Sequence, residues 1–138
     1  MEPVINWVAV AVASVASFAV GMIWYSPMLF GNTWIKLSGV DPKKMKGDKK
    51  KMMMTSMLGG AVIALVSSSV MAHFIDYTGA TTAMAGAVTA FWAWLGFVAT
   101  VQVGMVLWEG KPVKLFLLHT AQSLIALVVA GIINAVMV

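Results

Sequence analysis

The sequence predicts an all-α membrane protein: four transmembrane helices in a bundle, with a short interfacial helix and a Lys-rich cytoplasmic loop between the first two. Hydrophobic residues make up 61% of the 138 residues, and charged residues only 10%. Soluble domains carry about 25% charged residues, so this chain lacks the polar side chains to face water on all sides. Its charges are also confined to short segments, which leaves long uncharged stretches of the kind that bilayer hydrocarbon selects.

Four apolar stretches are long enough to span a membrane, within one transmembrane domain that covers 1–138. The first is closed by Pro27, because a proline ring disfavours helix at the residue before it. The last opens after Pro112, which suits a first helical turn. The N-terminus is acidic at Glu2 rather than basic, so we interpret the first span as a retained helix and not a signal peptide. The predicted spans are about 4–25, 52–74, 83–108 and 113–136.

The nine basic residues are all lysines, and their placement predicts one orientation. Seven lie in the loop between the first two spans, two lie in the third loop, and none lies in the second loop or at the termini. By the positive-inside rule, the first and third loops are cytoplasmic and both termini lie outside the inner (plasma) membrane. The long loop is either simply solvated or docks anionic lipid headgroups or an acidic partner subunit. Its candidate docking residues are Lys43, Lys44, Lys46, Lys49, Lys50 and Lys51.

Composition argues against several classes of function. The chain has no cysteine, which excludes disulfides and thiol chemistry, and no arginine, which nucleic-acid-binding patches usually contain. No charged residue lies near the centre of a span, although proton-coupled transporters usually depend on one. No nucleophile–base pair, phosphate-binding glycine loop or metal-ligand cluster is present. We therefore predict no enzyme activity, no metal or other cofactor, and no nucleic-acid partner.

Small residues recur at three- to four-residue spacing in every span. In lipid this pattern lets helix backbones approach closely. It predicts either packing within the bundle or the lining of a narrow path. The residues are Ala9, Ala13, Ser17 and Gly21; Gly60, Ala64, Ser68 and Ala72; Thr89, Ala93, Gly96, Thr100 and Gly104; and Ser123, Ala126, Ala130 and Asn134.

Three polar residues in the cytoplasmic half of the last two spans form a buried polar candidate site: Gln102, His119 and Gln122. Such groups cost free energy in hydrocarbon unless they find partners, so they should point into the bundle. They form either interhelical hydrogen bonds or a proton-sensitive or polar-ligand pocket, since histidine titrates near neutral pH. At the outer end of the second span, His73 and Asp76 are candidates for a local pair or cap.

An aromatic motif, W-Y-S-P-x-x-F-G-x-x-W, follows the first span. Its aromatic residues suit the membrane interface, Pro27 ends the helix, and Gly31 permits a turn before Trp34 returns to the headgroups. A lipid headgroup or small molecule bound under this turn is the alternative to simple anchoring. The motif residues are Trp24, Tyr25, Ser26, Pro27, Phe30, Gly31 and Trp34.

With this motif the chain resembles a family of small prokaryotic membrane proteins catalogued as domain of unknown function seventeen-sixty-one. The resemblance extends loosely to Gly96-Phe97, to Trp108-Glu109-Gly110 and to Gly131 in the last span. It implies four helices and a prokaryotic inner membrane, and it implies no activity.

Two classes of function fit these observations. The first is a non-enzymatic oligomeric or accessory subunit, a homo-oligomer or part of a larger membrane complex, that acts through helix packing and interfacial or lipid contacts. The alternative is a small solute or ion transporter or channel, with Tyr25 and the buried polar candidate site as its lining. Lipid binding by the aromatic motif and the lysine loop is compatible with either class.

Overall fold

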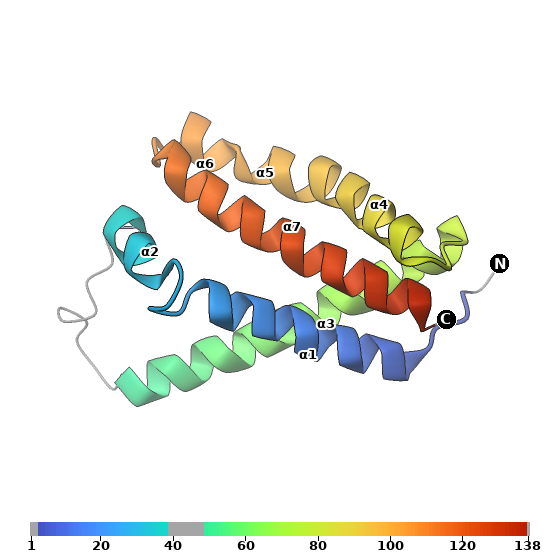
Figure 1. The fold of residues 1–138 in the computed structure, drawn as a ribbon. Helices are drawn as coiled ribbons and strands as arrows, with labels where there is room; N and C mark the ends of the chain where they lie inside the picture. The colour runs from blue at the N-terminus through green and yellow to red at the C-terminus, as the bar shows by residue number, and fades with distance from the viewer. Residues whose placement is uncertain (1–2, 39–48, 138) are drawn as a thin grey trace.

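The computed structural model describes residues 3–38 and 49–137, and its regular elements there are helices (Figure 1). Four of its helical stretches are long and apolar enough to cross a membrane, which confirms the predicted fold class. The third stretch combines α4, η1, α5 and α6. The elements are α1 (Trp7–Trp24), α2 (Gly31–Ser38), α3 (Lys49–Thr78), α4 (Ala83–Trp94), the π-helix η1 (Leu95–Ala99), α5 (Thr100–Gln102), α6 (Gly104–Leu107) and α7 (Val113–Val136).

Part of the predicted lysine loop lies outside the described residues. Lys43, Lys44 and Lys46 fall in the segment 39–48. Lys49 and Lys50 begin α3, but their side chains also lie outside the described part of the chain. The interfacial helix that the sequence predicts before this loop corresponds to α2.

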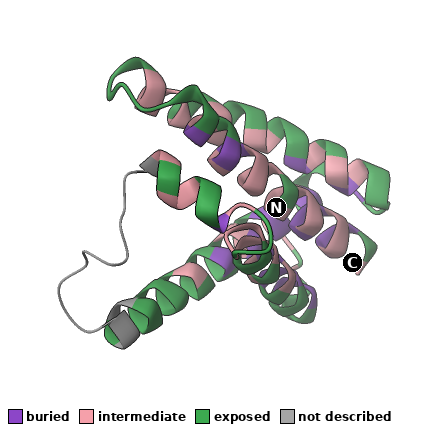
Figure 2. Cartoon of the chain, turned by 60° about the vertical axis from the view of Figure 1, so that its left-hand side comes forward, coloured by how far each residue is buried: buried purple, intermediate pink, exposed green. Residues whose placement is uncertain are grey.

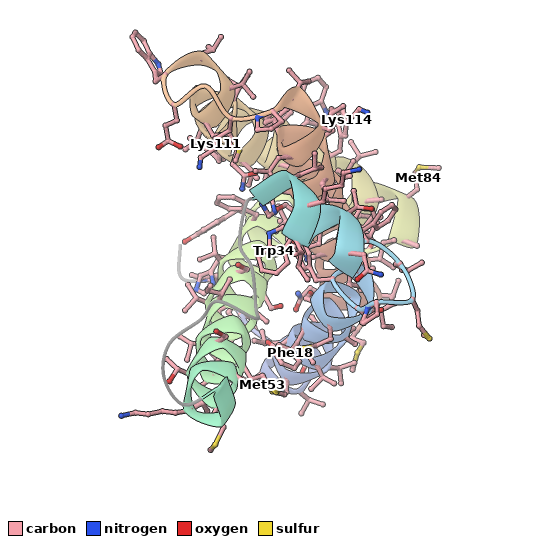
Figure 3. The ribbon with its side chains drawn as sticks, turned by 90° about the vertical axis from the view of Figure 1, so that its left-hand side faces the viewer. Phe18, Trp34, Met53, Met84, Lys111 and Lys114 are labelled. Atoms are coloured by element: carbon pink, nitrogen blue, oxygen red, sulfur yellow. The ribbon has the colours of Figure 1, made fainter. Side chains whose placement is uncertain are left out.

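Successive spans run in opposite directions, so the bundle has two different ends (Figure 1). At the end that we call the terminal end, the amide nitrogen Nδ2 of Asn6 donates to the carbonyl of Met137 at 2.6 Å. The opposite end, which we call the lysine end, carries α2, the start of α3 and the connection 108–112. Lys111 and Lys114 lie at this end together with Trp34 of α2 (Figure 3).

Local capping explains the tight reversal between α3 and α4 at the terminal end. Gly79 has a positive φ of 70°, and its amide donates to the carbonyl of Asp76 while the amide of Ala80 donates to that of Ile75. This pair of bonds is the glycine-terminated helix end that favours a left-handed residue. Thr82 then caps α4 by accepting from the amide of Ala85 at 3.1 Å.

The C-terminal helix α7 is the central element, because it packs against α1, α3 and α4. Buried residues follow the inner faces where these helices meet, and exposed residues cover the outside (Figure 2). The closest approach is between α4 and α7: a Cβ built on Gly131 would lie 2.5 Å from the carbonyl oxygen of Gly86. A side chain at either glycine would therefore overlap the backbone of the other helix.

The small-residue pattern is used mainly inside the bundle. In α1, α3 and α7, residues such as Ala13, Ser68 and Ala130 are buried, as predicted for packing. The prediction for the third span holds only in part, because Thr89, Ala93 and Gly104 are half-buried, whereas Gly96 and Thr100 are exposed. The fully buried small residues of this span are Gly86 and Ala90, both in α4.

Helix α3 is much longer than its neighbour α1. Its 30 residues span about 45 Å, against about 27 Å for the 18 residues of α1. It also ends at Thr78, one turn beyond the predicted end of the second span. In its first turns, Met53, Met54, Met57 and Leu58 are exposed, as expected for side chains that face lipid.

Candidate functional site

The aromatic motif folds into a compact turn that joins α1 to α2. The amide of Phe30 donates to the carbonyl of Trp24 at 3.0 Å, and that of Gly31 donates to the carbonyl of Ser26 at 2.9 Å. A Cβ on Gly31 would lie 2.6 Å from the carbonyl oxygen of Tyr25, so this close backbone contact requires glycine. The rings of Trp24 and Phe30 pack with centroids 4.5 Å apart. The turn therefore holds the motif aromatics in fixed positions at the lysine end.

Tyr25 connects this turn to α7. Its ring meets that of Trp34 edge-on with centroids 5.9 Å apart, and its hydroxyl lies 2.6 Å from Nδ1 of His119. Burial raises the pKa of Tyr25 to about 12, so the hydroxyl keeps its proton and can donate it to the imidazole. A neutral imidazole that accepts at Nδ1 carries its own proton on Nε2. In that tautomer His119 offers one N–H donor, on Nε2, whereas in the other tautomer Nδ1–H donates to the tyrosine oxygen.

The π-helix η1 sets which side chains of the third span meet α7. A π-turn accommodates one residue more than an α-turn, and one residue corresponds to about 100° of rotation in a helix of 3.6 residues per turn. Beyond η1, Gln102 and Met105 lie partly buried, whereas Phe97 within it is 70% exposed. The extra residue thus turns Gln102 and Met105, in the half of the third span nearer the lysine end, toward α7.

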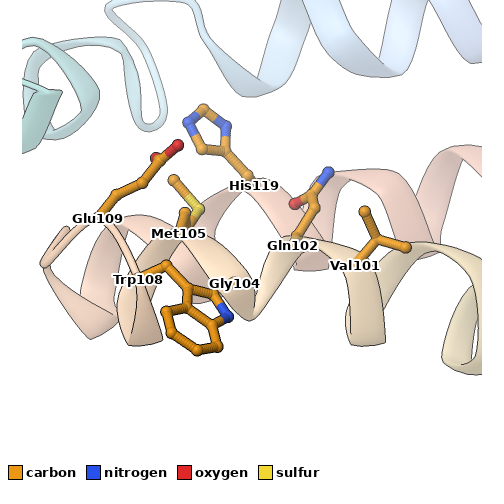
Figure 4. A pocket seen from close by; sticks show the side chains of 7 residues that line it. All are labelled: Val101, Gln102, Gly104, Met105, Trp108, Glu109 and His119. Atoms are coloured by element: carbon orange, nitrogen blue, oxygen red, sulfur yellow. The ribbon is translucent and has the colours of Figure 1, made fainter.

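A pocket of about 500 Å³ opens between this half of the third span and α7. In Figure 4 the carboxylate of Glu109 and the amide of Gln102 lie on either side of the His119 imidazole. The amide oxygen Oε1 of Gln102 is buried without a hydrogen-bond partner, which costs free energy. The lining residues are Val101, Gln102, Gly104, Met105, Trp108, Glu109 and His119.

The structure brings together two of the three residues of the predicted polar site. Gln102 and His119 line the same pocket, whereas Gln122 does not line it. Gln122 lies against α1 instead, where its Nε2 would be 3.4 Å from a Cβ on Gly21. One turn further along the same interface, Ser17 Oγ donates to the carbonyl of Ala126 at 3.2 Å.

The candidate pair in α3 does not form. His73 Nδ1 lies 2.6 Å from the carbonyl oxygen of Ser69, one turn back in the same helix, and Asp76 is exposed. His73 thus satisfies its hydrogen bonding locally.

Sequence reasoning missed Glu109 as a pocket residue. The one signal for it was its place as the acid of the third loop, directly after Trp108. Although Glu109 is exposed, it lines the pocket, and it stands next to the chain reversal at Gly110, which has a positive φ of 66°. Neither feature could be recognised from hydrophobic periodicity.

A second pocket, of about 350 Å³, lies between α3 and α4 and shares no residue with the first. Aromatic side chains dominate its wall, including Phe74, Tyr77 and Trp92. It offers few polar groups to a ligand.

Comparison with known proteins identifies the family. No curated protein and no solved structure matches the chain. The family model described as "Protein of unknown function (DUF1761)" matches residues 8–135, which include the aromatic turn, the pocket and nearly all of the four spans. This multi-pass membrane protein therefore belongs to the DUF1761 family.

Proposed function

We propose that this protein binds a small polar ligand in the pocket at the lysine end and does not transform it chemically. The observation that carries the proposal is the pair of polar groups on separate walls, Glu109 after α6 and His119 on α7. The hydrogen bond from Tyr25 fixes the orientation of His119, as expected for a prearranged binding group.

Unsatisfied hydrogen bonding favours a ligand over a purely structural role. If these groups served only to join the third span to α7, their polar atoms would pair with each other. Within the described residues, however, Gln102 Oε1 is buried without a partner, and the carboxylate of the exposed Glu109 forms no hydrogen bond or ion pair. A ligand that bridges the pocket would supply the missing partners.

We also propose that the lysine end is cytoplasmic. At this end of the described chain, α2 contains Lys36, the start of α3 contains Lys51, and Figure 3 shows Lys111 and Lys114. Lysine-rich loops stay on the cytoplasmic side. The pocket would then open toward the cytoplasmic leaflet.

Two further roles build on the same fold. An oligomeric or accessory subunit is favoured by the exposed small residues Gly96 and Thr100, since a Cβ on Gly96 would meet nothing within 4 Å. A helix of a second copy or of a larger complex would approach closely there. Transport of a solute or ion would use the same pocket as its binding site. A transport path would also have to continue beyond it, and the two pockets described above share no lining residue.

The test of ligand binding is native mass spectrometry of protein extracted in mild detergent from its own membranes. We expect a non-covalent adduct on the wild type that is lost in Glu109→Gln and in His119→Phe. The chain supplies matched controls in Asp76→Asn and His73→Phe, which change a carboxylate and a histidine in α3 and should keep the adduct.

Two outcomes would overturn the proposal: no adduct on the wild type, or an adduct equally present on all four variants. Thermal unfolding of each variant separates loss of ligand from loss of fold. The same spectra report the number of subunits, and a purely monomeric protein without partners would contradict the oligomeric role.

A further inference from the structure

We propose that the ligand of this pocket is a zwitterion with a primary ammonium group and a phosphate. This is the chemistry of an ethanolamine phospholipid headgroup and of free phosphoethanolamine. The inference rests on the proposed function and adds the chemical class of the ligand. It is drawn from how charge is distributed around the pocket.

The negative part of the pocket is the carboxylate of Glu109. The described residues contain one other acid, Asp76, which lies near the terminal end of α3. They contain no group of three metal-ligating side chains, so a metal ion would find too few ligands. An ammonium group brings three N–H donors and no acceptor. It matches the exposed carboxylate of Glu109, which has no partner among the described residues.

The absence of an aromatic cage favours a primary amine over a quaternary one. Quaternary ammonium groups are bound between aromatic faces. In Figure 4, the indole of Trp108 lies on the opposite side of the ribbon from Glu109, Met105 and His119. Its side chain is 88% exposed, so it cannot enclose a cation held by Glu109. Hydrogen bonds must therefore provide the recognition.

Two exposed lysines that do not themselves line the pocket follow this carboxylate closely in the sequence. Lys111 follows Glu109 by two residues, and its backbone amide donates to the carbonyl of Met105, a pocket residue, at 3.0 Å. Lys114 lies in the first turn of α7, whose N-cap residue, Pro112, provides no side-chain hydrogen bond. Lysine ammonium groups and the amides of a helix N-terminus both attract phosphate.

His119 supplies a hydrogen-bond donor beside Glu109 in the same pocket. With Nδ1 engaged by Tyr25, the Nε2–H is the group that the imidazole can offer to a phosphate ester oxygen. A zwitterion would thus satisfy the carboxylate, the imidazole and the lysines together. A purely anionic ligand would leave Glu109 unpaired, and a simple amine would leave the lysines without a partner.

The experiment compares three phospholipids with identical acyl chains. Delipidated protein is incubated with phosphatidylethanolamine, phosphatidylcholine or phosphatidylglycerol in detergent, and retained lipid is measured by native mass spectrometry. We expect the ethanolamine lipid to be retained about tenfold more strongly than the other two, the scale of one charge-assisted hydrogen-bonded contact. Glu109→Gln should remove this preference and Asp76→Asn should keep it.

A lysine variant tests whether Lys111 and Lys114 bind the phosphate. The double substitution Lys111→Gln and Lys114→Gln should weaken retention of all three lipids, because all carry the same phosphate. Unchanged retention in this variant would overturn the assignment of the phosphate.

A competition arm separates the two sources of the zwitterion. If soluble phosphoethanolamine displaces the lipid from the wild type, the headgroup alone is sufficient and the free compound is a ligand. If it does not, the acyl chains contribute and the lipid is the ligand. Choline phosphate, which lacks N–H donors, should not compete in either case.

The outcomes that contradict this inference differ from those that contradict ligand binding. Equal retention of the three lipids, with a native adduct that still depends on Glu109 and His119, would overturn the zwitterion and leave the binding pocket intact. No adduct or lipid dependent on Glu109 in either experiment would overturn both proposals.

Discussion

The two halves of α7 meet their neighbours in opposite ways. Toward the terminal end, Gly131 meets the backbone of Gly86, and Asn134 Nδ2 donates to the carbonyl of Ser68 in α3 at 3.5 Å. Toward the lysine end, a pocket of about 500 Å³ lies between the third span and α7 beside His119. The comparison teaches that one helix can be locked at one end and open at the other. We expect stability to depend mainly on the first half, and ligand binding on the second.

The largest effect should come from adding a methyl group at the locked end. Gly131→Ala would place a Cβ 2.5 Å from the carbonyl oxygen of Gly86, so we expect the free energy of unfolding to fall by about 3 kcal/mol. Gly59→Ala is the matched control, because a Cβ there meets nothing within 4 Å. Unfolding in detergent measures both. Equal stability of the two variants would contradict the distinction between the halves.

At the open end, Tyr25→Phe should have a smaller effect on stability and a clear effect on His119. Losing the bond between the tyrosine hydroxyl and Nδ1 should cost about 1 kcal/mol. The imidazole would also lose the partner that fixes its tautomer, which ¹⁵N NMR of the labelled histidine detects. Tyr77→Phe serves as control. An unchanged His119 spectrum would show that the hydroxyl does not bind the ring.

Titration of Tyr25 tests how well the turn is packed. Burial raises the pKa of Tyr25 from 10.0 to about 12, so the folded state holds this proton more tightly than the unfolded state. The associated stability is therefore complete below pH 10 and is lost as the pH rises toward 12. Ultraviolet absorbance should show a late tyrosinate transition in the wild type that is missing in Tyr25→Phe. Ionisation near pH 10 would mean that water reaches the turn.

The smallest effect on stability is expected from Gln102→Met. Its Oε1 is buried without a partner, so removing the amide should leave stability unchanged or slightly raised, while the ligand adduct is lost. Asn134→Leu is the contrast, because Asn134 has a partner and its loss should cost about 1 kcal/mol. Thermal unfolding compares the two. A large destabilisation by Gln102→Met would give this residue a structural role.

Much of the fold could be predicted because its signals are local. Pro27 and Pro112 mark the ends of spans, and long uncharged stretches define the spans themselves. The shared depth of Gln102 and His119 followed from counting residues along two neighbouring spans, and both line one pocket.

The phase of the third span could not be predicted in this way. The π-helix η1 contains Leu95-Gly96-Phe97-Val98-Ala99, which has no proline and reads as ordinary apolar helix. If a period of 3.6 residues per turn is continued through η1, every later residue is placed about 100° away from its actual direction around the helix axis. That is why Gly96 and Thr100 were assigned to a packed face and why Glu109 was overlooked.

The length of α3 has a consequence for the membrane around the protein. A bilayer core is about 30 Å thick, whereas the apolar part of α3, Met53–Thr78, would extend about 39 Å if it stood upright. Its far half is tied to α1 and α7, but its methionine-rich start is exposed. Hydrophobic mismatch is relieved by tilting, so the slant of α3 should follow the thickness of the surrounding lipid. Thicker membranes would let it stand straighter, and thinner ones would press its first turns toward the surface.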